Sequence, residues 1–186
     1  LRAWDLQAAG EALVASPTQE NFDAAKQAWI YAIEPYGQSE VYRFRVGPID
    51  ALLPDGSLGQ EGDGPEGAIN AWPLGEALID YVAAQVDGDA GPEVPGSTAS
   101  VNPNSIADLT ITISEQTLRD NNELGGDERN LSTGFHAIEF LLWGQDLNQA
   151  LTATGDRDAT GGQRPVSDYQ VGSACTSGLG TSSASV

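Results

Sequence analysis

Apolar residues recur at helical spacing over residues 3–15, among several good helix formers, which predicts a short first helix. A second pattern opens with a helix-start sequence. Ser16 can cap the helix, Pro17 suits its first position, and Gln19 completes a capping box. We therefore expect a second helix over residues 17–45.

The second predicted helix carries charged residues on its apolar face. At about 100° per residue, several side chains fall within about 60° of Trp29. They are Phe22, Ala25, Ile33, Tyr36, Glu40, Arg43 and Phe44. The apolar stripe thus includes the carboxylate of Glu40 and the guanidinium of Arg43. Pro35 lies in the interior of this helix and should bend it, because proline removes a backbone donor.

The middle of the chain alternates between glycine-rich stretches and apolar runs. Residues 46–70 and 87–103 are typical of loops. Between them, a helix is expected from about Asn70 to Pro73 through residue 86, with Leu74, Leu78, Tyr81 and Val82 on one face. Glu76 and Asp80 lie on another face, where they could form a carboxylate pair, although the pattern favours a solvated surface.

Two further helices complete the predicted fold. Residues 104–123 fit either a strand or a helix, and we favour a helix capped by Asn104 or Ser105, because no second strand is evident for pairing. The last regular element covers about residues 127–145. The pattern predicts an all-α, four-helix-bundle-like fold over residues 1–148, followed at 149–186 by an irregular Gly/Ser/Thr-rich tail or the start of a second half.

The last predicted helix contains the only histidine of the chain. Helical arithmetic gives it one polar and aromatic side and one aliphatic side, which is the expected core face. The first side holds Arg129, Ser132, His136, Glu139, Phe140 and Trp143, and the second holds Leu131, Ile138, Leu141 and Leu142. His136 and Glu139 lie one turn apart and can reach one ligand.

Three interpretations of His136 and Glu139 remain open from spacing alone. They could form a solvated polar stripe, although the aromatic residues beside them favour a covered pocket. A buried Glu139 would need a partner, which could be Arg43, Arg129 or a metal ion. A structural ion pair of Glu40 or Glu139 with Arg43 is the third possibility.

The composition of the chain limits which ligands it can bind and which kinds of site it can form. The 186 residues include 8 Lys and Arg against 27 Asp and Glu, a net charge of −19 that disfavours nucleic acid and anionic membranes. One cysteine, Cys175, excludes an internal disulfide and a cysteine metal cluster; we expect an unpaired thiol or half of a lost disulfide. Carboxylates with one imidazole suit iron, manganese or calcium better than structural zinc. Nucleotide-binding, G-x-S-x-G and H-E-x-x-H motifs are absent from the sequence.

Four sequence blocks resemble the imelysin-like family. The stretch GFHAIEFLLWGQDLN is similar to its G-x-H-x-x-E signature. The stretches AKQAWIYAIEPYGQSEVYRF, INAWPLGEALIDYV and RPVSDY are similar to three further family blocks in the same order. Family members continue into a second helical half, so the resemblance implies that this chain corresponds to the N-terminal half. The site would then be completed by a second half or by another chain of the same protein.

The resemblance also implies a location and a set of site residues. Family members are exported, and are periplasmic or lipid-anchored at the cell surface. They are linked to iron uptake, and some are classified as metallopeptidases. The resemblance nominates Gly134, His136 and Glu139 from the signature and Glu40 and Arg43 from the second helix, with Trp72 and Glu76 as weaker candidates.

The leading hypothesis is an extracytoplasmic protein that binds a metal ion or a metal-carrying ligand. His136, Glu139 and Glu40 are the expected ligands, and Arg43 would orient a carboxylate. Iron is favoured, with zinc or calcium as alternatives. A metallopeptidase, with Glu139 or Glu40 as general base, is the rival hypothesis. A non-catalytic cell-surface interaction module is the third.

Overall fold

The described part of the protein is all-α. The computed structural model describes residues 2–43, 47–60, 62, 64–80, 105–106, 108, 110–144, 162 and 164–171. Across these ranges the regular structure is helical, and the β pairing is limited to one isolated bridge between Leu52 and Leu58. Among the same residues, no helix is both long and apolar enough to cross a membrane. The predicted all-α bundle is therefore confirmed.

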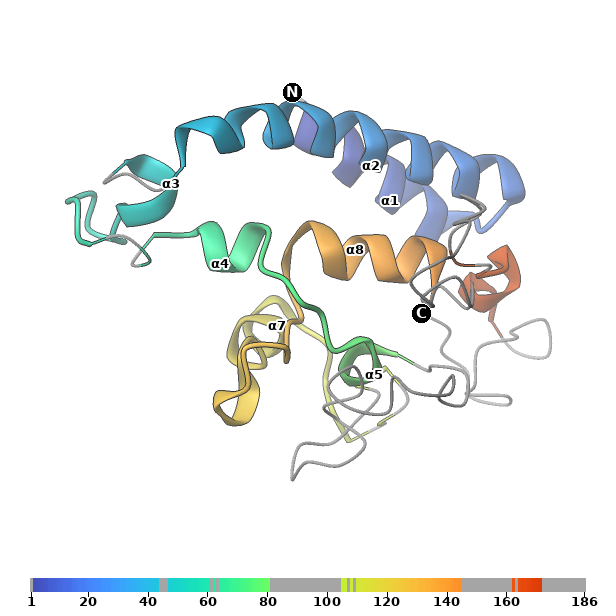
Figure 1. Cartoon of the computed structure of the whole chain (residues 1–186). Coiled ribbons are helices and arrows are strands. Elements are labelled where there is room, and N and C mark those ends of the chain that lie inside the picture. The colour runs from blue at the N-terminus through green and yellow to red at the C-terminus, as the bar shows by residue number, and fades with distance from the viewer. Residues whose placement is uncertain are drawn as a thin grey trace, which may run out of the picture.

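Two long helices, α1 (Arg2–Ala15) and α2 (Gln19–Ser39), lie side by side (Figure 1). The hydroxyl of Thr18 caps α2 by accepting a hydrogen bond from the Asn21 N–H at 3.2 Å. The prediction that Ser16 caps this helix is wrong, because the helix begins at Gln19 and its cap residue is Thr18; the Ser16 carbonyl accepts from the Asn21 side chain. The α2 helix also ends earlier than residue 45, and a 3-10 turn, η1 (Glu40–Tyr42), follows it. Pro35 lies inside α2, as predicted.

Three single-turn helices follow: α3 (Pro48–Ala51), α4 (Glu66–Ile69) and α5 (Glu76–Ile79). The prediction of loop over residues 46–70 is therefore wrong at α3 and α4. The helix expected to start near Asn70 begins only at Glu76. Its predicted continuation, which includes Tyr81 and Val82, lies outside the described residues.

The remaining described elements are α7 (Glu115–Asp120), η2 (Leu124–Gly126), α8 (Gly134–Trp143) and η3 (Val166–Tyr169). The α7 helix is capped by the Ser114 hydroxyl, which accepts from the Thr117 N–H at 3.1 Å. A helix start at Ser105 is therefore wrong, because the described residues between Ser105 and Ser114 are not helical; Asn104 lies outside the described residues.

The α8 helix starts seven residues later than the predicted Asp127. If the helix began earlier, the carbonyl groups that precede Gly134 would accept hydrogen bonds from N–H groups of the helix itself. These carbonyl groups instead accept from other segments. The Arg129 carbonyl accepts from the Gly75 N–H at 2.6 Å, and the Asn130 carbonyl accepts from the Glu123 N–H at 2.6 Å. Residues 127–133 are consequently a loop that joins α8 to neighbouring segments.

The α8 helix lies between the α1 and α2 pair and the segment that contains α5 (Figure 1). Two hydrophobic clusters meet on it. One contains Leu13, Phe22, Ala25, Leu142 and Tyr169, and the other contains Leu74, Ile79, Leu131, Ala137 and Phe140. The predicted core face is thus partly wrong. Phe140 is 3% exposed and Ile138 is 37% exposed, because neighbours on two sides bury α8 along a different stripe.

Trp29 joins α2 to the start of α8. Its indole N–H donates a hydrogen bond to the Phe135 carbonyl at 2.8 Å. Its ring also meets the rings of Phe135 and Trp143 edge-on, with centroids 6.4 and 5.4 Å apart. This combination of a directional bond and aromatic contacts fixes the position of α8 along α2.

A buried ionic network links α5 to η3. Arg164 Nη1 donates to Asp80 Oδ2 at 2.6 Å and to Asp168 Oδ2 at 3.2 Å, and each of these side chains is at most 1% exposed. The expectation of a solvated Asp80 is therefore wrong. Next to it, the Tyr169 hydroxyl donates to the Leu141 carbonyl at 2.6 Å, and burial raises the Tyr169 pKa. The η3 turn thus packs into the helical core through Tyr169.

We predict that Trp29→Phe lowers the free energy of unfolding by about 1–2 kcal/mol. The variant keeps an aromatic ring but loses the hydrogen bond to the Phe135 carbonyl and part of the buried ring. Urea denaturation would measure the loss. Trp4→Phe is the matched control, because Trp4 is exposed and should change stability by less than about 0.5 kcal/mol. Equal losses in the two variants would contradict the role of Trp29.

We predict that Arg164→Met lowers the free energy of unfolding by about 3–5 kcal/mol, because it leaves two buried carboxylates without this guanidinium. Arg119→Met removes an exposed pair with Glu115 and should cost no more than about 0.5 kcal/mol. Denaturation curves of both variants would test the difference. A small loss for Arg164→Met would mean that the network contributes little to the fold.

Candidate functional site

His136 lies in a polar pocket of about 430 Å³. The pocket wall comes from Arg43 just after η1, from α4 and the segment after it, from the η2 region and from α8. The lining residues are Arg43, Glu66, Asn70, Ala71, Trp72, Glu123, Glu128 and His136. Three carboxylates, one guanidinium, one imidazole and one indole therefore surround the same space, which we call the polar pocket.

Gly134 sets the position of α8 against α4. Its φ angle is +89°, in the region that favours glycine, and a Cβ atom added to it would lie 2.5 Å from the Ile69 carbonyl oxygen. A side chain at this position would therefore separate the two backbones. Because His136 is two residues further along α8, this close approach holds its ring beside the segment that carries Asn70 and Trp72.

His136 and Glu139 face the same way and contact each other. His136 Nδ1 lies 2.9 Å from Glu139 Oε2, one helical turn away. Their side chains are 24% and 42% exposed, so the pair is half-covered rather than either fully wet or buried. A carboxylate accepts hydrogen bonds, so Nδ1–H donates to Glu139, and in the neutral ring Nε2 carries the lone pair. The indole of Trp72 covers the imidazole with ring centroids 4.9 Å apart.

Arg43 organises the acidic side of the polar pocket. Its Nη1 lies 2.9 Å from Glu66 Oε1 and 3.7 Å from Glu40 Oε1, and its Nε lies 3.6 Å from Asp50 Oδ1. Glu40 also accepts a hydrogen bond from the Asn70 side chain at 3.0 Å. Of the ion pairs proposed for Arg43, the one with Glu40 is therefore present. Glu139 instead has His136 as its neighbour.

Three other predicted site residues lie away from this arrangement. Arg129 and Ser132 are not on α8, because that helix begins only at Gly134. Arg129 pairs with Asp127 at 2.6 Å and lowers the Asp127 pKa to about 2 through a side-chain hydrogen bond. The Ser132 hydroxyl donates to the Leu118 carbonyl. Glu76 begins α5 and is not among the residues that line the polar pocket.

Several residues of the polar pocket were not predicted as site residues from the sequence. They are Glu66, Asn70, Glu123 and Glu128, and Asp50, which does not line the pocket, is a further missed partner of Arg43. Asp50 and Glu66 lie in a glycine-rich stretch that gave no helical pattern. Glu123 adopts φ +57° at the start of η2, which no local pattern predicts. Asn70 alone had a signal, since it belongs to the block INAWPLGEALIDYV that resembles the imelysin-like family.

The predicted ligands do not meet as one cluster. Glu40 lies with Arg43 and Asn70, whereas Glu139 lies with His136. Within the described ranges, no three His, Cys, Asp or Glu side chains are arranged to hold a metal ion. Cys175 lies outside those ranges. The described residues therefore do not form a metal site with three protein ligands.

We predict that Gly134→Ala lowers the free energy of unfolding by about 1–3 kcal/mol, because the new Cβ meets the α4 backbone at a positive φ. Gly10→Ala is the matched control. Gly10 lies within α1 with open space around it, so this change should stabilise the protein by about 0.5–1 kcal/mol. Urea denaturation would reveal the opposite signs, and the same sign for both would contradict the close approach.

Comparison with known proteins identifies the family to which this chain belongs. The comparison with curated proteins gave no match. The family model described as Imelysin, a peptidase family named M75, matches residues 2–185. This match spans nearly the whole chain and agrees with the helical fold of the described residues. The chain therefore belongs to the imelysin family.

Proposed function

We propose that this imelysin-family protein acts outside the cytoplasm and binds a metal ion, or a ligand that carries one, at the polar pocket. The observation that carries the proposal is the contact of His136 Nδ1 with Glu139 at 2.9 Å. This contact orients the imidazole and leaves Nε2 as its metal-binding nitrogen. Carboxylate–histidine pairs of this kind are common around protein-bound metals.

The proposal changes the role expected for Glu139. As the acceptor of the Nδ1–H, Glu139 positions the ring rather than binding the metal itself. One of the carboxylates that line the pocket, Glu66, Glu123 or Glu128, is the candidate oxygen donor beside the imidazole. One imidazole with carboxylates suits iron, which we favour, and is also compatible with zinc or calcium.

The small number of protein ligands limits how a metal ion could be bound here. Because no three of the described residues form a complete cluster, the other coordination positions need donors from elsewhere. Water, the carrier of the metal, or a second helical half or chain of the same protein could supply them. We therefore place the protein in the capture or transfer of iron. The net charge of −19 supports this role, since it attracts cations and suits an extracytoplasmic setting.

A metallopeptidase is the second candidate, favoured by the peptidase description of the family. It would need a metal-bound water with Glu139 or Glu40 as general base. The chain has a single histidine, and the described residues lack a three-ligand cluster, so this function demands more from outside the chain than metal capture does. A cell-surface interaction module remains a third candidate, because Arg43 already partly neutralises Glu66, Asp50 and Glu40.

We predict saturable binding of iron to the wild-type protein and its loss in His136→Ala. Isothermal titration with ferrous, ferric, zinc and calcium ions would measure it. Glu139→Ala should weaken binding about 10–100-fold, because the imidazole loses its orienting carboxylate. Glu11→Ala is the control, since it removes a carboxylate from α1, which contributes no residue to the polar pocket.

The outcomes separate the three candidates. The absence of saturable binding in the wild-type protein would overturn the metal proposal, and unchanged binding in His136→Ala would place the metal elsewhere. Chelator-sensitive cleavage of a protein substrate that is lost in Glu139→Gln or Glu40→Gln would favour the peptidase. Partner binding that survives His136→Ala, without any metal binding, would favour the interaction module.

A further inference from the structure

The charged side chains of the polar pocket come from two parts of its wall. Among the described residues that line the pocket, Arg43 is the one basic side chain, and Glu66 forms an ion pair with it. The other two charged residues, Glu123 and Glu128, come from the loop that contains η2. The two parts of the wall therefore meet a ligand with different groups, and we consider them separately.

We infer that Glu123 and Glu128 are specificity-determining residues of the polar pocket, which admit a metal ion that arrives with water or other neutral ligands and exclude a metal held in an anionic chelate. This inference rests on the proposed function and names the form in which the metal is taken. Three features of the pocket lead to it: the surroundings of Arg43, the two carboxylates of the η2 loop, and the exposed indole of Trp72.

Arg43 does not make the pocket a receptor for anions. Three carboxylates surround its guanidinium at 2.9 to 3.7 Å, and they belong to Glu40, Asp50 and Glu66. One positive charge among three negative charges leaves this part of the wall negative. An anionic chelate that approached Arg43 would therefore also approach an excess of like charge, which disfavours its binding.

Glu123 and Glu128 add two carboxylates that no basic side chain neutralises. Within the described ranges, neither of them forms an ion pair. The third acidic residue of this loop, Asp127, differs in this respect, because Arg129 pairs with it at 2.6 Å. The η2 loop thus directs its one guanidinium to Asp127 and presents two uncompensated negative charges to the pocket, which favours a cationic ligand.

Hydrogen bonds hold the η2 loop against the pocket. The Glu123 N–H donates to the Asn130 carbonyl at 2.6 Å, and the Asn130 side chain donates to the Leu124 carbonyl. Asn130 itself is 0% exposed, so the loop is closed around a buried amide. The carboxylates of Glu123 and Glu128 are exposed, but the backbone that carries them is fixed at the rim of the pocket.

Trp72 provides a neutral surface that also favours cations. Its side chain lines the pocket, is 69% exposed and lies beside the His136 imidazole, with ring centroids 4.9 Å apart. The face of an indole attracts a cation through the ring quadrupole. The pocket of about 430 Å³ also has room for a hydrated ion, since six waters take up roughly 180 Å³.

The experiment compares two inert octahedral complexes of opposite charge, hexaamminecobalt(III) and hexacyanocobaltate(III), with the whole chain. Neither complex exchanges its ligands for a protein side chain, so the comparison measures charge selection without metal coordination. His136 is the only histidine of the chain, so isotope-labelled histidine gives one imidazole signal, inside the pocket, in an NMR titration. We expect the cationic complex to shift this signal saturably and the anionic complex to bind at least about tenfold more weakly.

Paired variants test the two carboxylates. Glu123→Gln combined with Glu128→Gln should weaken the binding of hexaamminecobalt(III) about fivefold to twentyfold, because two negative charges beside a triply charged cation are lost. The matched control combines Glu11→Gln with Glu20→Gln. It removes the same charge from α1 and α2, at positions that do not line the pocket, and should weaken binding less than about twofold. Circular dichroism would verify that both variants are folded.

Three results would overturn the inference. They are the absence of a saturable shift with the cationic complex, equal binding of the two complexes, and equal weakening by the two double variants. Iron titration tests the metal proposal separately. If iron does not bind but the two cobalt complexes behave as expected, the metal proposal fails and the charge selection by Glu123 and Glu128 stands. If iron binds but both complexes shift the His136 signal equally, the charge selection fails alone.

Discussion

The contact between Trp29 and the first turn of α8 is the constraint on which the other features of this structure depend. The hydrogen bond from the indole to the Phe135 carbonyl fixes α8 along α2 at the residue that precedes His136. The same helix carries residues of both hydrophobic clusters, so its position determines how the α1 and α2 pair meets the α5 segment. A bond that stabilises the fold therefore also places the imidazole of the candidate site.

The polar pocket is assembled from segments far apart in the sequence, and two kinds of contact hold them together. On one side, the missing side chain of Gly134 lets the start of α8 touch the backbone of α4. On the other side, Arg43, directly after η1, pairs with Asp50 in α3 and Glu66 in α4. The first contact is steric and the second electrostatic. Together they explain why His136 and the carboxylate of Glu66 border the same space.

Local patterns in the sequence predicted the all-α class, a short and then a longer helix at the start of the chain, and the shared direction of His136 and Glu139. They failed where distant contacts override local preference. The α8 helix starts late because loop carbonyls before it bond to distant N–H groups, and its buried stripe includes Phe140 because helices cover it on two sides. Helical arithmetic finds one apolar face and cannot anticipate a second neighbour. The pairing of Asp80 with Arg164, which are 84 positions apart, likewise leaves no periodic signal.

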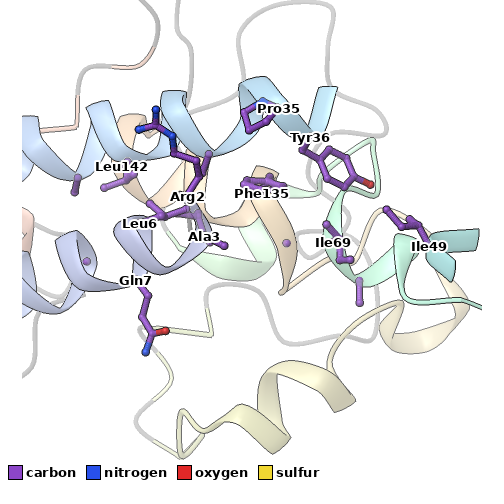
Figure 2. Close-up of a pocket in the computed structure, with 16 residues that line it drawn as sticks. Arg2, Ala3, Leu6, Gln7, Pro35, Tyr36, Ile49, Ile69, Phe135 and Leu142 are labelled. Carbon is purple, nitrogen blue, oxygen red and sulfur yellow. The ribbon is translucent and has the colours of Figure 1, made fainter. Parts of the chain in front are cut away.

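The single turn of α4 lies between the polar pocket and an apolar cavity of about 990 Å³ beside α1, α2 and α8 (Figure 2). Glu66 faces the polar pocket, as does Asn70 directly after the helix, while Ala68 and Ile69 face the apolar cavity. The Ile69 carbonyl is also the group that Gly134 approaches, and Gly134 itself lines the apolar cavity. One short helix thus divides a charged site from an apolar one, and the start of α8 is fitted against it. Because both spaces share this wall, a displacement of α4 would alter the carboxylates around His136 and the volume beside Tyr36 together.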